Sequence, residues 1–408
     1  MEAIKRKLLS SLINHLKEKQ FSIISGPRQS GKTTLLNQVA AILKQNMEEV
    51  YFLTLEDPTI LARLNQHPEN LFEFVIRSPE KKVFVLLDEV QYLDNPSNFL
   101  KLLYDRYSPQ LKIVATGSSA FYIDRKFKDS LAGRKRLFEL YTLDFDEFLI
   151  FRTGTNNLAE ELDRIRQNEM YISSKRKELE SYFNEYVTYG GYPAVVLAGT
   201  QEKKVEMLKE LTGSFLKRDI AESNIQDREK FYQLLLILSQ QTGSLINTNE
   251  LSRTLMMSVT AVENYLYVLQ KCFHIHLLRP FYKNIRKELI KMPKVFFHDL
   301  GFRNVLLNQF FPLVQRLDKG MVIENYAFIR LRTLFGNDNL RFWRTADGHE
   351  IDFIHTQSQD SGEAIEIKFE VSSFNPAKYG NFREAYPGYS LGVRAFHSNT
   401  NKNSLIAL

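Results

Sequence analysis

The sequence predicts an α/β fold that starts with a parallel sheet covered by helices and ends in an α+β region. Three observations support it. Four short runs between residues 21 and 117 are apolar throughout, as in strands buried on both faces of a sheet. The segments between these runs are long enough for crossover helices. The pattern turns helical and charged after about residue 155, and strand-like again after residue 340.

Each element follows from its residues in chain order. The amphipathic start, with leucines at helical spacing, predicts a first helix. Strands are expected at 21–25, 50–55, 82–88 and 111–117, with a fifth near 137–141. The later helical part is interrupted by a turn at 190–193. We expect four domains, at 1–150, 151–240, 241–310 and 311–408: a parallel sheet with helices, a helical and charged region, a unit of two short helices with two strand-like runs, and an α+β domain.

Composition excludes several classes of protein. The 408 residues include 30 Phe and 19 Tyr, which is ample core material and excludes disorder as the main state. No run of 18 apolar residues occurs, so no membrane span is expected. The basic start lacks the continuous apolar stretch of a secretory signal. A single cysteine, Cys272, excludes a disulfide scaffold, and we expect a cytoplasmic protein.

A phosphate-binding motif follows the first predicted strand. Residues 26–33 match G-x-x-x-x-G-K-[ST] between a strand and a helix, which is the context that the motif requires. Loop N–H groups and the helix N-terminus would bind phosphate oxygens, Lys32 would reach the β- and γ-phosphates, and the Thr33 hydroxyl would bind Mg²⁺. The predicted nucleotide-binding residues are Gly26, Pro27, Arg28, Gln29, Ser30, Gly31, Lys32, Thr33 and Thr34.

An acidic pair ends the third predicted strand. Asp88 would orient the magnesium ion, and Glu89 would polarise the attacking water of an ATPase or GTPase. The competing interpretation is an acidic pair that merely caps a strand. On the next strand Thr116, Ser118 and Ser119 are candidates for γ-phosphate contact, with an ordinary turn as the alternative.

Phosphoryl transfer also needs positive charge to offset the charge that develops on the phosphate. Arg134 and Arg218 are the candidate arginine fingers or sensors. A structural or solvent-facing arginine is the competing interpretation for each.

Several of these segments together resemble an AAA-type, STAND-like ATPase family of bacteria and archaea. They are GPRQSGKTTLL (26–36), VFVLLDEVQ (83–91), TGSSA (116–120), LAGRKRLFEL (131–140) and GGYP (190–193). Residues 241–253 and 293–307 resemble the C-terminal region of unknown function that its members usually carry. The resemblance covers nearly the whole chain. It implies an AAA-like sheet, a helical lid, a winged helix and a nuclease-like end, but no known substrate.

The positive charge is concentrated in one segment. The chain has a net charge of +6, and residues 271–300 hold seven basic residues against Glu288 and Asp299. Two short helices capped at Asn247 and Ser258 precede this segment, in winged-helix order. A basic hairpin there would suit DNA phosphates, although winged helices also dock proteins. His274 and His276 are interpreted as wing residues rather than metal ligands.

Carboxylates recur in the last hundred residues at a spacing that resembles the PD-(D/E)XK nuclease core. Asp352 lies in one predicted strand, and Glu366 and Lys368 lie on one face of the next. Glu324 is a third candidate metal ligand and Glu350 an outside candidate. Such a set would bind Mg²⁺ for phosphodiester cleavage. The alternative is a nuclease fold retained for binding, with structural carboxylates.

These patterns leave three functions open. The first is an Mg²⁺-dependent ATPase that switches conformation by hydrolysis, with a DNA-contacting winged helix. The second is a nucleotide-gated DNA nuclease in which Asp352, Glu366 and Lys368 are catalytic. The third is a signalling scaffold that binds ATP slowly and docks a protein partner. Assembly into a homo-oligomer is compatible with each.

Overall fold

The computed structural model describes residues 4–76, 81–117, 131–222, 225–282, 284–358, 360–398 and 400–408. The chain divides into two compact units. Unit 1 comprises residues 1–141 with 271–273, and unit 2 comprises 142–270 with 274–408. The second predicted domain boundary, near 240, falls inside unit 2, whereas the first unit ends nine residues before the expected boundary at 150.

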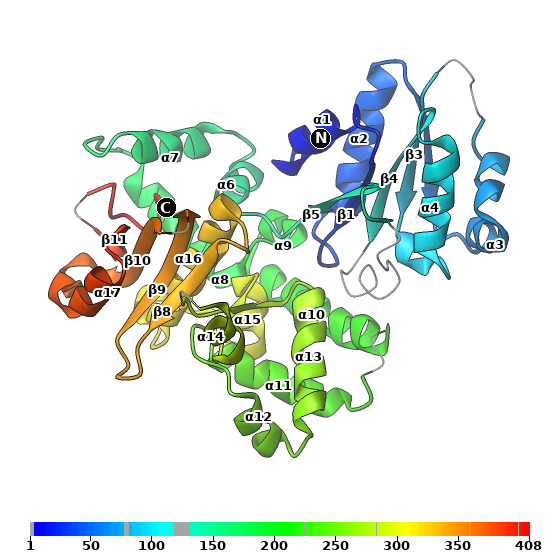
Figure 1. Cartoon of the computed structure of the whole chain (residues 1–408). Helices are drawn as coiled ribbons and strands as arrows, with labels where there is room; N and C mark the ends of the chain where they lie inside the picture. Colours follow the sequence, from blue (N-terminus) through cyan, green and yellow to red (C-terminus); the bar gives the residue numbers. More distant parts are fainter. Residues whose placement is uncertain are drawn as a thin grey trace. The chain divides into compact units, whose positions relative to one another are not determined.

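Unit 1 contains a five-stranded parallel sheet, as the sequence predicts (Figure 1). Its order is β2-β3-β4-β1-β5, and its strands are β1 (Phe21–Ser25), β2 (Glu49–Thr54), β3 (Val83–Asp88), β4 (Leu111–Gly117) and β5 (Lys135–Glu139). The fifth strand starts two residues before the expected position because Phe21 already donates its N–H to the Arg134 carbonyl. β4 therefore separates the strand that precedes the phosphate loop from the strand that ends in Asp88.

Helices cover both faces of this sheet. The elements are α1 (Leu8–His15), α2 (Lys32–Gln45), α3 (Pro58–Gln66), η1 (Pro68–Glu73), η2 (Val90–Tyr92) and α4 (Pro96–Tyr107). Alternate strand residues point to opposite faces, so Phe84 and Leu86 pack with α1 and α2, whereas Val85 and Leu87 pack with α3 and α4. The apolar strand runs thus reflect burial on both faces, as predicted.

Unit 2 is largely helical before its C-terminal sheet. Its helices up to residue 307 are α6 (Phe145–Thr153), α7 (Asn157–Gln167), α8 (Arg176–Tyr189), α9 (Pro193–Leu197), α10 (Gln201–Glu222), α11 (Arg228–Gln240), α12 (Thr248–Leu255), α13 (Val259–Lys271), α14 (Ile285–Ile290) and α15 (Leu300–Leu307). The predicted turn between α8 and α9 is present. Gly190 has φ +76°, and Gly191 donates its N–H to Asp299 at 2.8 Å.

The basic segment follows α12 and α13. Its strands, β6 (Ile275–Leu278) and β7 (Lys294–Phe297), pair antiparallel, as the expected basic hairpin requires. A short helix that the sequence analysis did not predict, α14, lies between the two strands. Among the described side chains here, Arg279, Arg286 and Lys291 are exposed. Lys294 is buried instead, at 1% exposure.

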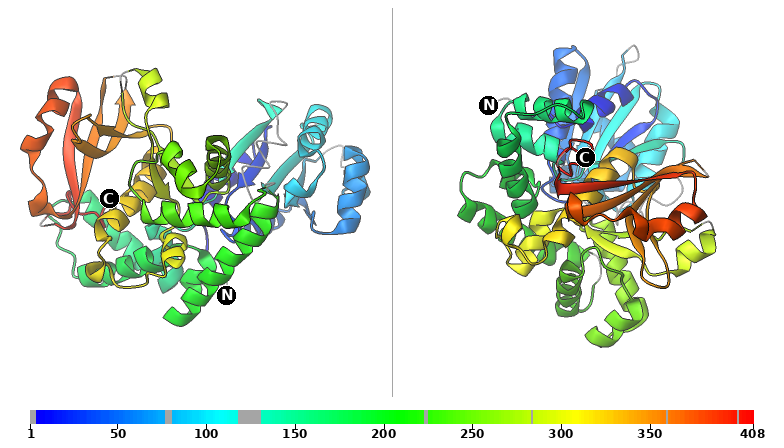
Figure 2. Two further views of the ribbon diagram at one scale, coloured as in Figure 1. Left: turned by 90° about the horizontal axis from the view of Figure 1, so that it is seen from below. Right: turned by 90° about the vertical axis from the view of Figure 1, so that its left-hand side faces the viewer.

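The C-terminal part forms a four-stranded sheet of order β11-β10-β9-β8 (Figures 1 and 2). Its elements are α16 (Lys319–Phe335), β8 (Leu340–Arg344), β9 (Glu350–Ser358), β10 (Ser361–Glu370), α17 (Gly380–Ala385) and β11 (Tyr389–His397). β10 and β11 are parallel, and the other neighbours are antiparallel. Phe328 of α16 packs with Phe353 in one core cluster, whereas Phe382 of α17 packs with Ile351 in another.

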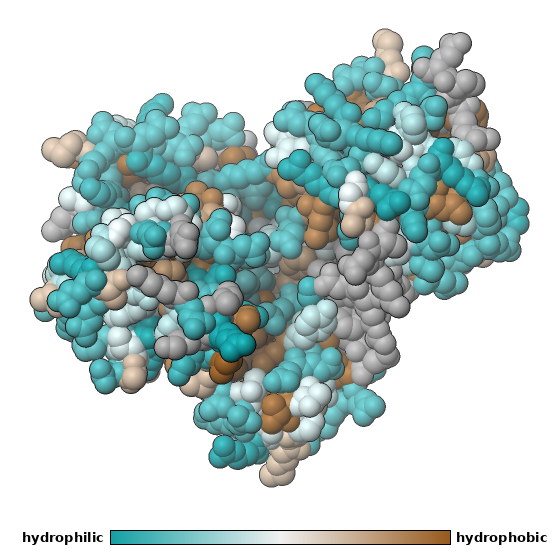
Figure 3. Space-filling view, in the orientation of Figure 1, coloured by the Kyte–Doolittle hydropathy of each residue, from teal (hydrophilic) through white to brown (hydrophobic). Residues whose placement is uncertain are grey.

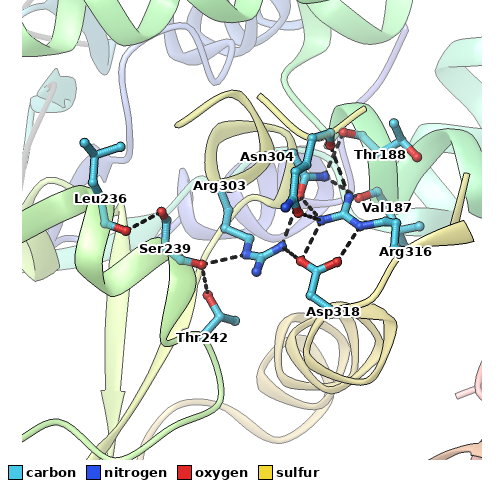
Figure 4. Close-up of polar contacts among 10 residues, drawn as sticks. Val187, Thr188, Leu236, Ser239, Thr242, Arg303, Asn304, Arg316 and Asp318 are labelled. Carbon is cyan, nitrogen blue, oxygen red and sulfur yellow. Dashed lines mark hydrogen bonds and ion pairs between the residues drawn. The ribbon is translucent and has the colours of Figure 1, made fainter. Parts of the chain in front are cut away.

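A buried polar network joins the helices of unit 2 (Figure 4). Arg303 of α15 donates to the Ser239 carbonyl at 2.9 Å and forms an ion pair with Asp318 at 2.5 Å. Arg316 also pairs with Asp318, at 2.8 Å, while Asn304 donates to two carbonyl oxygens of α8. One carboxylate thus neutralises two buried guanidinium groups.

The expectation about membranes can be compared with the helices directly. No helix in the described part of the chain is long and apolar enough to cross a membrane. In the view of Figure 3 the described surface is mainly hydrophilic, with apolar side chains in scattered groups.

Candidate functional site

The phosphate motif forms a tight loop between β1 and α2. Gln29 and Gly31 have φ values of +60° and +94°, so the backbone turns back on itself before Lys32 begins the helix. Successive N–H groups in such a loop can converge on an anion, and the helix dipole favours negative charge at this end. The local structure is therefore a tight turn at a helix N-terminus, of the kind that can bind an anion.

Two contacts hold this loop against the end of β5. A Cβ on Gly26 would lie 2.0 Å from the Leu140 carbonyl oxygen, so only glycine fits there. Arg6 donates to the Ser30 carbonyl at 2.7 Å and to the Tyr141 carbonyl at 2.9 Å, and its side chain is buried. The sequence offered no signal for the role of Arg6, because its partners are 24 and 135 positions away.

The motif lysine lies inside the loop. Lys32 Nζ donates to the Gly26 carbonyl at 3.0 Å and the Pro27 carbonyl at 2.9 Å, and the residue is 5% exposed. Both acceptors belong to the motif itself. The ammonium group is therefore held within the loop, where a phosphate oxygen would be its natural partner.

Three predicted residues from separate elements meet beside the loop. The Thr33 hydroxyl donates to Asp88 Oδ2 at 2.8 Å, and the Thr116 hydroxyl donates to Asp88 Oδ1. Thr116 also accepts the backbone N–H of Glu89 at 3.0 Å. Glu89 has a left-handed backbone, with φ +60°, and its carboxylate accepts a hydrogen bond from Gln91. Gln91 is a neighbour of Glu89 that the sequence analysis did not select.

This arrangement fits a nucleotide with magnesium. A hydroxyl and a carboxylate are oxygen ligands of the kind Mg²⁺ takes together with phosphate oxygens. Thr33 and Asp88 would hold the ion, the loop N–H groups and Lys32 would hold the phosphates, and Glu89 lies next to the ion-binding carboxylate. Magnesium would supply charge neutralisation of the phosphates during transfer.

Arg134 lies elsewhere than the predicted nucleotide contact requires. Its carbonyl pairs with Phe21 at the start of β1, whereas the loop follows Ser25 at the end, about 15 Å along the strand. Its guanidinium donates to Asp105 of α4 at 2.6 Å. This places Arg134 away from the phosphate loop of its own unit, because Arg134 precedes β5 whereas the loop follows its parallel neighbour β1, so the two lie at opposite ends of adjacent strands.

The remaining phosphate candidates are not described by the structure. Ser118 and Ser119 lie outside the described residues, and so does the side chain of Arg218. Their assignments stay predictions.

A second group of charged residues forms in unit 2 around Lys294 of β7. Its Nζ lies 2.8 Å from Glu324 Oε1, 2.5 Å from Glu350 Oε1 and 3.8 Å from Asp352 Oδ1. We call Glu324, Glu350, Asp352 and Glu366 the carboxylate cluster. The structure thus brings the predicted C-terminal residues together, and it adds a lysine that the sequence analysis had counted with the basic surface.

Other partners complete the carboxylate cluster. Asp352 Oδ2 accepts the Ile367 N–H at 2.8 Å, and Glu366 Oε2 accepts the Asp352 N–H at 3.4 Å across the β9–β10 pair. Lys368 forms an ion pair with Glu366, as expected for side chains on one face of a strand. Arg344 binds Glu350 at 2.7 Å.

Burial dominates the ionisation of this cluster. It raises the pKa of Glu324 to about 8 and that of Glu366 to about 7, and it raises the pKa of Asp352 as well. Burial would lower the pKa of Lys294, but the surrounding carboxylates outweigh it and the pKa is raised. Lys294 therefore stays charged at neutral pH.

The cluster does not fit a divalent metal as it stands. In the described ranges, no three His, Cys, Asp or Glu residues are placed to hold a metal ion together. The cation at the centre of Glu324, Glu350 and Asp352 is the lysine ammonium. This geometry does not support the predicted metal-ligand roles of Glu324, Asp352 and Glu366. It does not support the predicted catalytic roles of Asp352, Glu366 and Lys368 either, and all of these roles stay predictions.

Of the two histidines of the basic segment, His274 is buried and His276 is partly buried. His274 stacks on Phe302 with ring centroids 4.4 Å apart and lies 3.7 Å from the Phe215 centroid. Burial lowers the pKa of His274 and of His276 to about 3, so both are neutral packing residues at physiological pH.

Comparison with known families agrees with the geometry of unit 1. Residues 18–149 match a family described as an AAA domain. This range contains the phosphate loop, Asp88 and the five parallel strands, so the match covers the part of the chain in which the parallel sheet and the phosphate loop lie. Residues 180–312 and 319–405 match two families described only as domains of unknown function, DUF8612 and DUF4143.

Relatives share most of the chain. An uncharacterized protein of Methanocaldococcus jannaschii is 26% identical over 364 residues, covering 87% of this chain and 76% of that protein. One of Haemophilus influenzae is 26% identical over 374 residues, covering 89% and 86%. Among solved structures, the Aeropyrum pernix ORC2 protein in its ADP form has a TM-score of 0.33 at 14% identity, over 66% of this chain and 85% of that one. A likeness at that score carries no conclusion about function.

Proposed function

We propose that this protein binds ATP and hydrolyses it with Mg²⁺ at the phosphate loop of unit 1. The observation that carries the proposal is the meeting of Thr33 and Thr116 on the two oxygens of Asp88, beside Lys32. These side chains come from α2, β4 and β3. Because an isolated glycine-rich turn would not assemble them, their convergence supports a complete phosphoryl-transfer site. The base of the nucleotide stays open.

Two substitutions separate binding from turnover. Lys32→Ala removes the ammonium that would pair with the phosphates, so we expect loss of both ATP affinity and hydrolysis. Glu89→Gln removes the carboxylate that would polarise water, so we expect ATP affinity to be kept and turnover to fall about 100-fold or more. Fluorescent-nucleotide titration and phosphate release measure the two properties.

Arg134→Ala is the matched control, because Arg134 pairs with Asp105 at the end of the strands away from the phosphate loop. We expect near-normal nucleotide binding and turnover. If Lys32→Ala binds and hydrolyses ATP as the unsubstituted protein does, the proposal is wrong. Tight ATP binding with negligible turnover in the unsubstituted protein would favour the scaffold function instead.

We further propose that hydrolysis changes the conformation of the chain and that residues 271–300 contact DNA. The support for DNA contact is local. Arg279, Arg286 and Lys291 are exposed around α14, directly after the helix pair α12 and α13. That order of elements is the winged-helix order, and exposed cations on a wing suit phosphates. A protein partner at this surface is the rival.

A further inference from the structure

The carboxylate cluster encloses the side chain of a lysine, Lys294. Lys294 is the first residue of β7, in an apolar strand whose other residues are fully buried. A lysine side chain is almost never this buried unless it is paired. Its 2% side-chain exposure and two carboxylate contacts within 2.8 Å therefore mark a specific position for one positive charge.

The geometry of the contacts is that of an ammonium site. The nitrogen lies 2.8 Å and 2.5 Å from oxygens of Glu324 and Glu350, which are charge-assisted hydrogen-bond distances. The Phe342 ring lies below it, with its centroid 5.5 Å away. A magnesium ion would need several oxygens at about 2.1 Å, and no group of three suitable ligands exists among the described residues.

Carboxylates of the cluster also bind groups other than Lys294. Arg344 binds Glu350, Lys368 binds Glu366, and the Ile367 N–H binds Asp352. Three cationic side chains thus face four carboxylates, so a divalent ion would have to displace a buried ammonium that already holds two of them.

We propose that the Lys294 ammonium group is the resident cation of this cluster. It holds the position that a divalent metal would take, and it therefore excludes a metal ion from the site. The C-terminal carboxylates then stabilise unit 2 by joining β7 to α16 and β9. Removing the lysine charge would uncover a latent metal site made of Glu324, Asp352 and their neighbours. This inference is independent of ATP hydrolysis in unit 1.

Manganese binding tests the proposal directly. The full chain is prepared free of nucleotide in an Asp88→Asn background, so that the phosphate loop contributes no metal site, and is titrated with Mn²⁺ by electron paramagnetic resonance. We expect no stoichiometric Mn²⁺ binding below about 1 mM when Lys294 is present. Lys294→Met keeps the length of the side chain without its charge, and we expect about one Mn²⁺ bound at least 10-fold more tightly.

Three further variants keep the experiment decisive. Adding Asp352→Asn should abolish the new Mn²⁺ binding, and Lys291→Met, which removes an exposed lysine three positions away, should not create it. If Lys294→Met does not fold, Lys294→Met with Glu350→Gln removes one charge of each sign and takes its place. Stoichiometric, Asp352-dependent Mn²⁺ binding with Lys294 present would overturn the proposal, and so would a folded Lys294→Met variant that binds no Mn²⁺.

Discussion

Single hydroxyl groups decide the geometry at the phosphate site. Thr116 donates to Asp88 and accepts the N–H of Glu89, so one side chain fixes both acidic residues. Glu89 takes a left-handed backbone that few residues adopt without support. The Glu89 N–H donates to the Thr116 hydroxyl at 3.0 Å, and this hydrogen bond supports that backbone conformation.

Asp318 is the residue whose substitution is expected to change the free energy of unfolding. Burial disfavours its charge, but Arg316 and Arg303 outweigh burial and lower its pKa to about 2. Asp318→Asn leaves two buried guanidinium groups without a counter-charge, so we expect the free energy of unfolding to fall by about 3 kcal/mol at pH 7. Chemical denaturation measures it. The exposed ion pair of Asp163 gives the control, since Asp163→Asn should cost less than about 1 kcal/mol.

The same carboxylate predicts a pH dependence. Because its pKa is lower in the folded state, its stabilisation is fully present above pH 3.8 and is lost as the pH falls toward 2. The difference in stability between the unsubstituted protein and Asp318→Asn should therefore shrink between pH 4 and pH 2. A difference that stays constant over that range would contradict the assignment.

At the scale of elements, the junction between the phosphate loop and β5 is tightly packed. Ser25 and Glu139 end neighbouring parallel strands, and Leu140 donates its N–H to the Ser25 carbonyl at 2.7 Å. The loop leaves β1 directly beneath the Leu140 carbonyl. The position of the loop is thus set by strand pairing and not by the motif residues alone.

Gly26→Ala tests this junction. The new methyl group would lie 2.0 Å from the Leu140 carbonyl, which is backbone and can only yield by moving the strand end. We expect nucleotide affinity to fall at least 10-fold and the midpoint of thermal unfolding to drop. Gly213→Ala, in α10 with open space around it, is the matched control and should leave both unchanged or raise helix stability slightly. Unaltered nucleotide affinity in Gly26→Ala would show that the loop does not depend on this packing.

At the scale of the whole molecule, the prediction concerns the effect of the exposed cations around α14 on DNA binding. If the exposed cations around α14 bind phosphates, replacing Arg279, Arg286 and Lys291 by alanine should weaken duplex DNA binding at low salt. The slope of log affinity against log salt should become shallower by about 1 for each lost contact. The control replaces three exposed lysines elsewhere in unit 2, Lys177, Lys203 and Lys209. Equal losses in the two variants, or no DNA binding at all, would point to a protein partner.

Some expectations held because they depended on neighbours along the chain. The parallel sheet was predictable from apolar runs that proved to be buried on both faces, and Lys368 was predictable beside Glu366 because strand residues two apart share a face. The helix α14 within the basic segment was not, because its 6 residues are too few to show a helical period.

The sequence by itself determined the phosphate loop, since a strand, a glycine-containing turn and a helix N-terminus are contiguous in residues 21–45. Only the tertiary structure decided which charges meet. Arg134 pairs with Asp105 at the end of the strands away from the phosphate loop. Lys294 enters a carboxylate cluster whose nearest member in the sequence, Glu324, is 30 positions away. The physical reason is that local spacing fixes backbone conformation, whereas the partner of a buried charge depends on how distant elements pack.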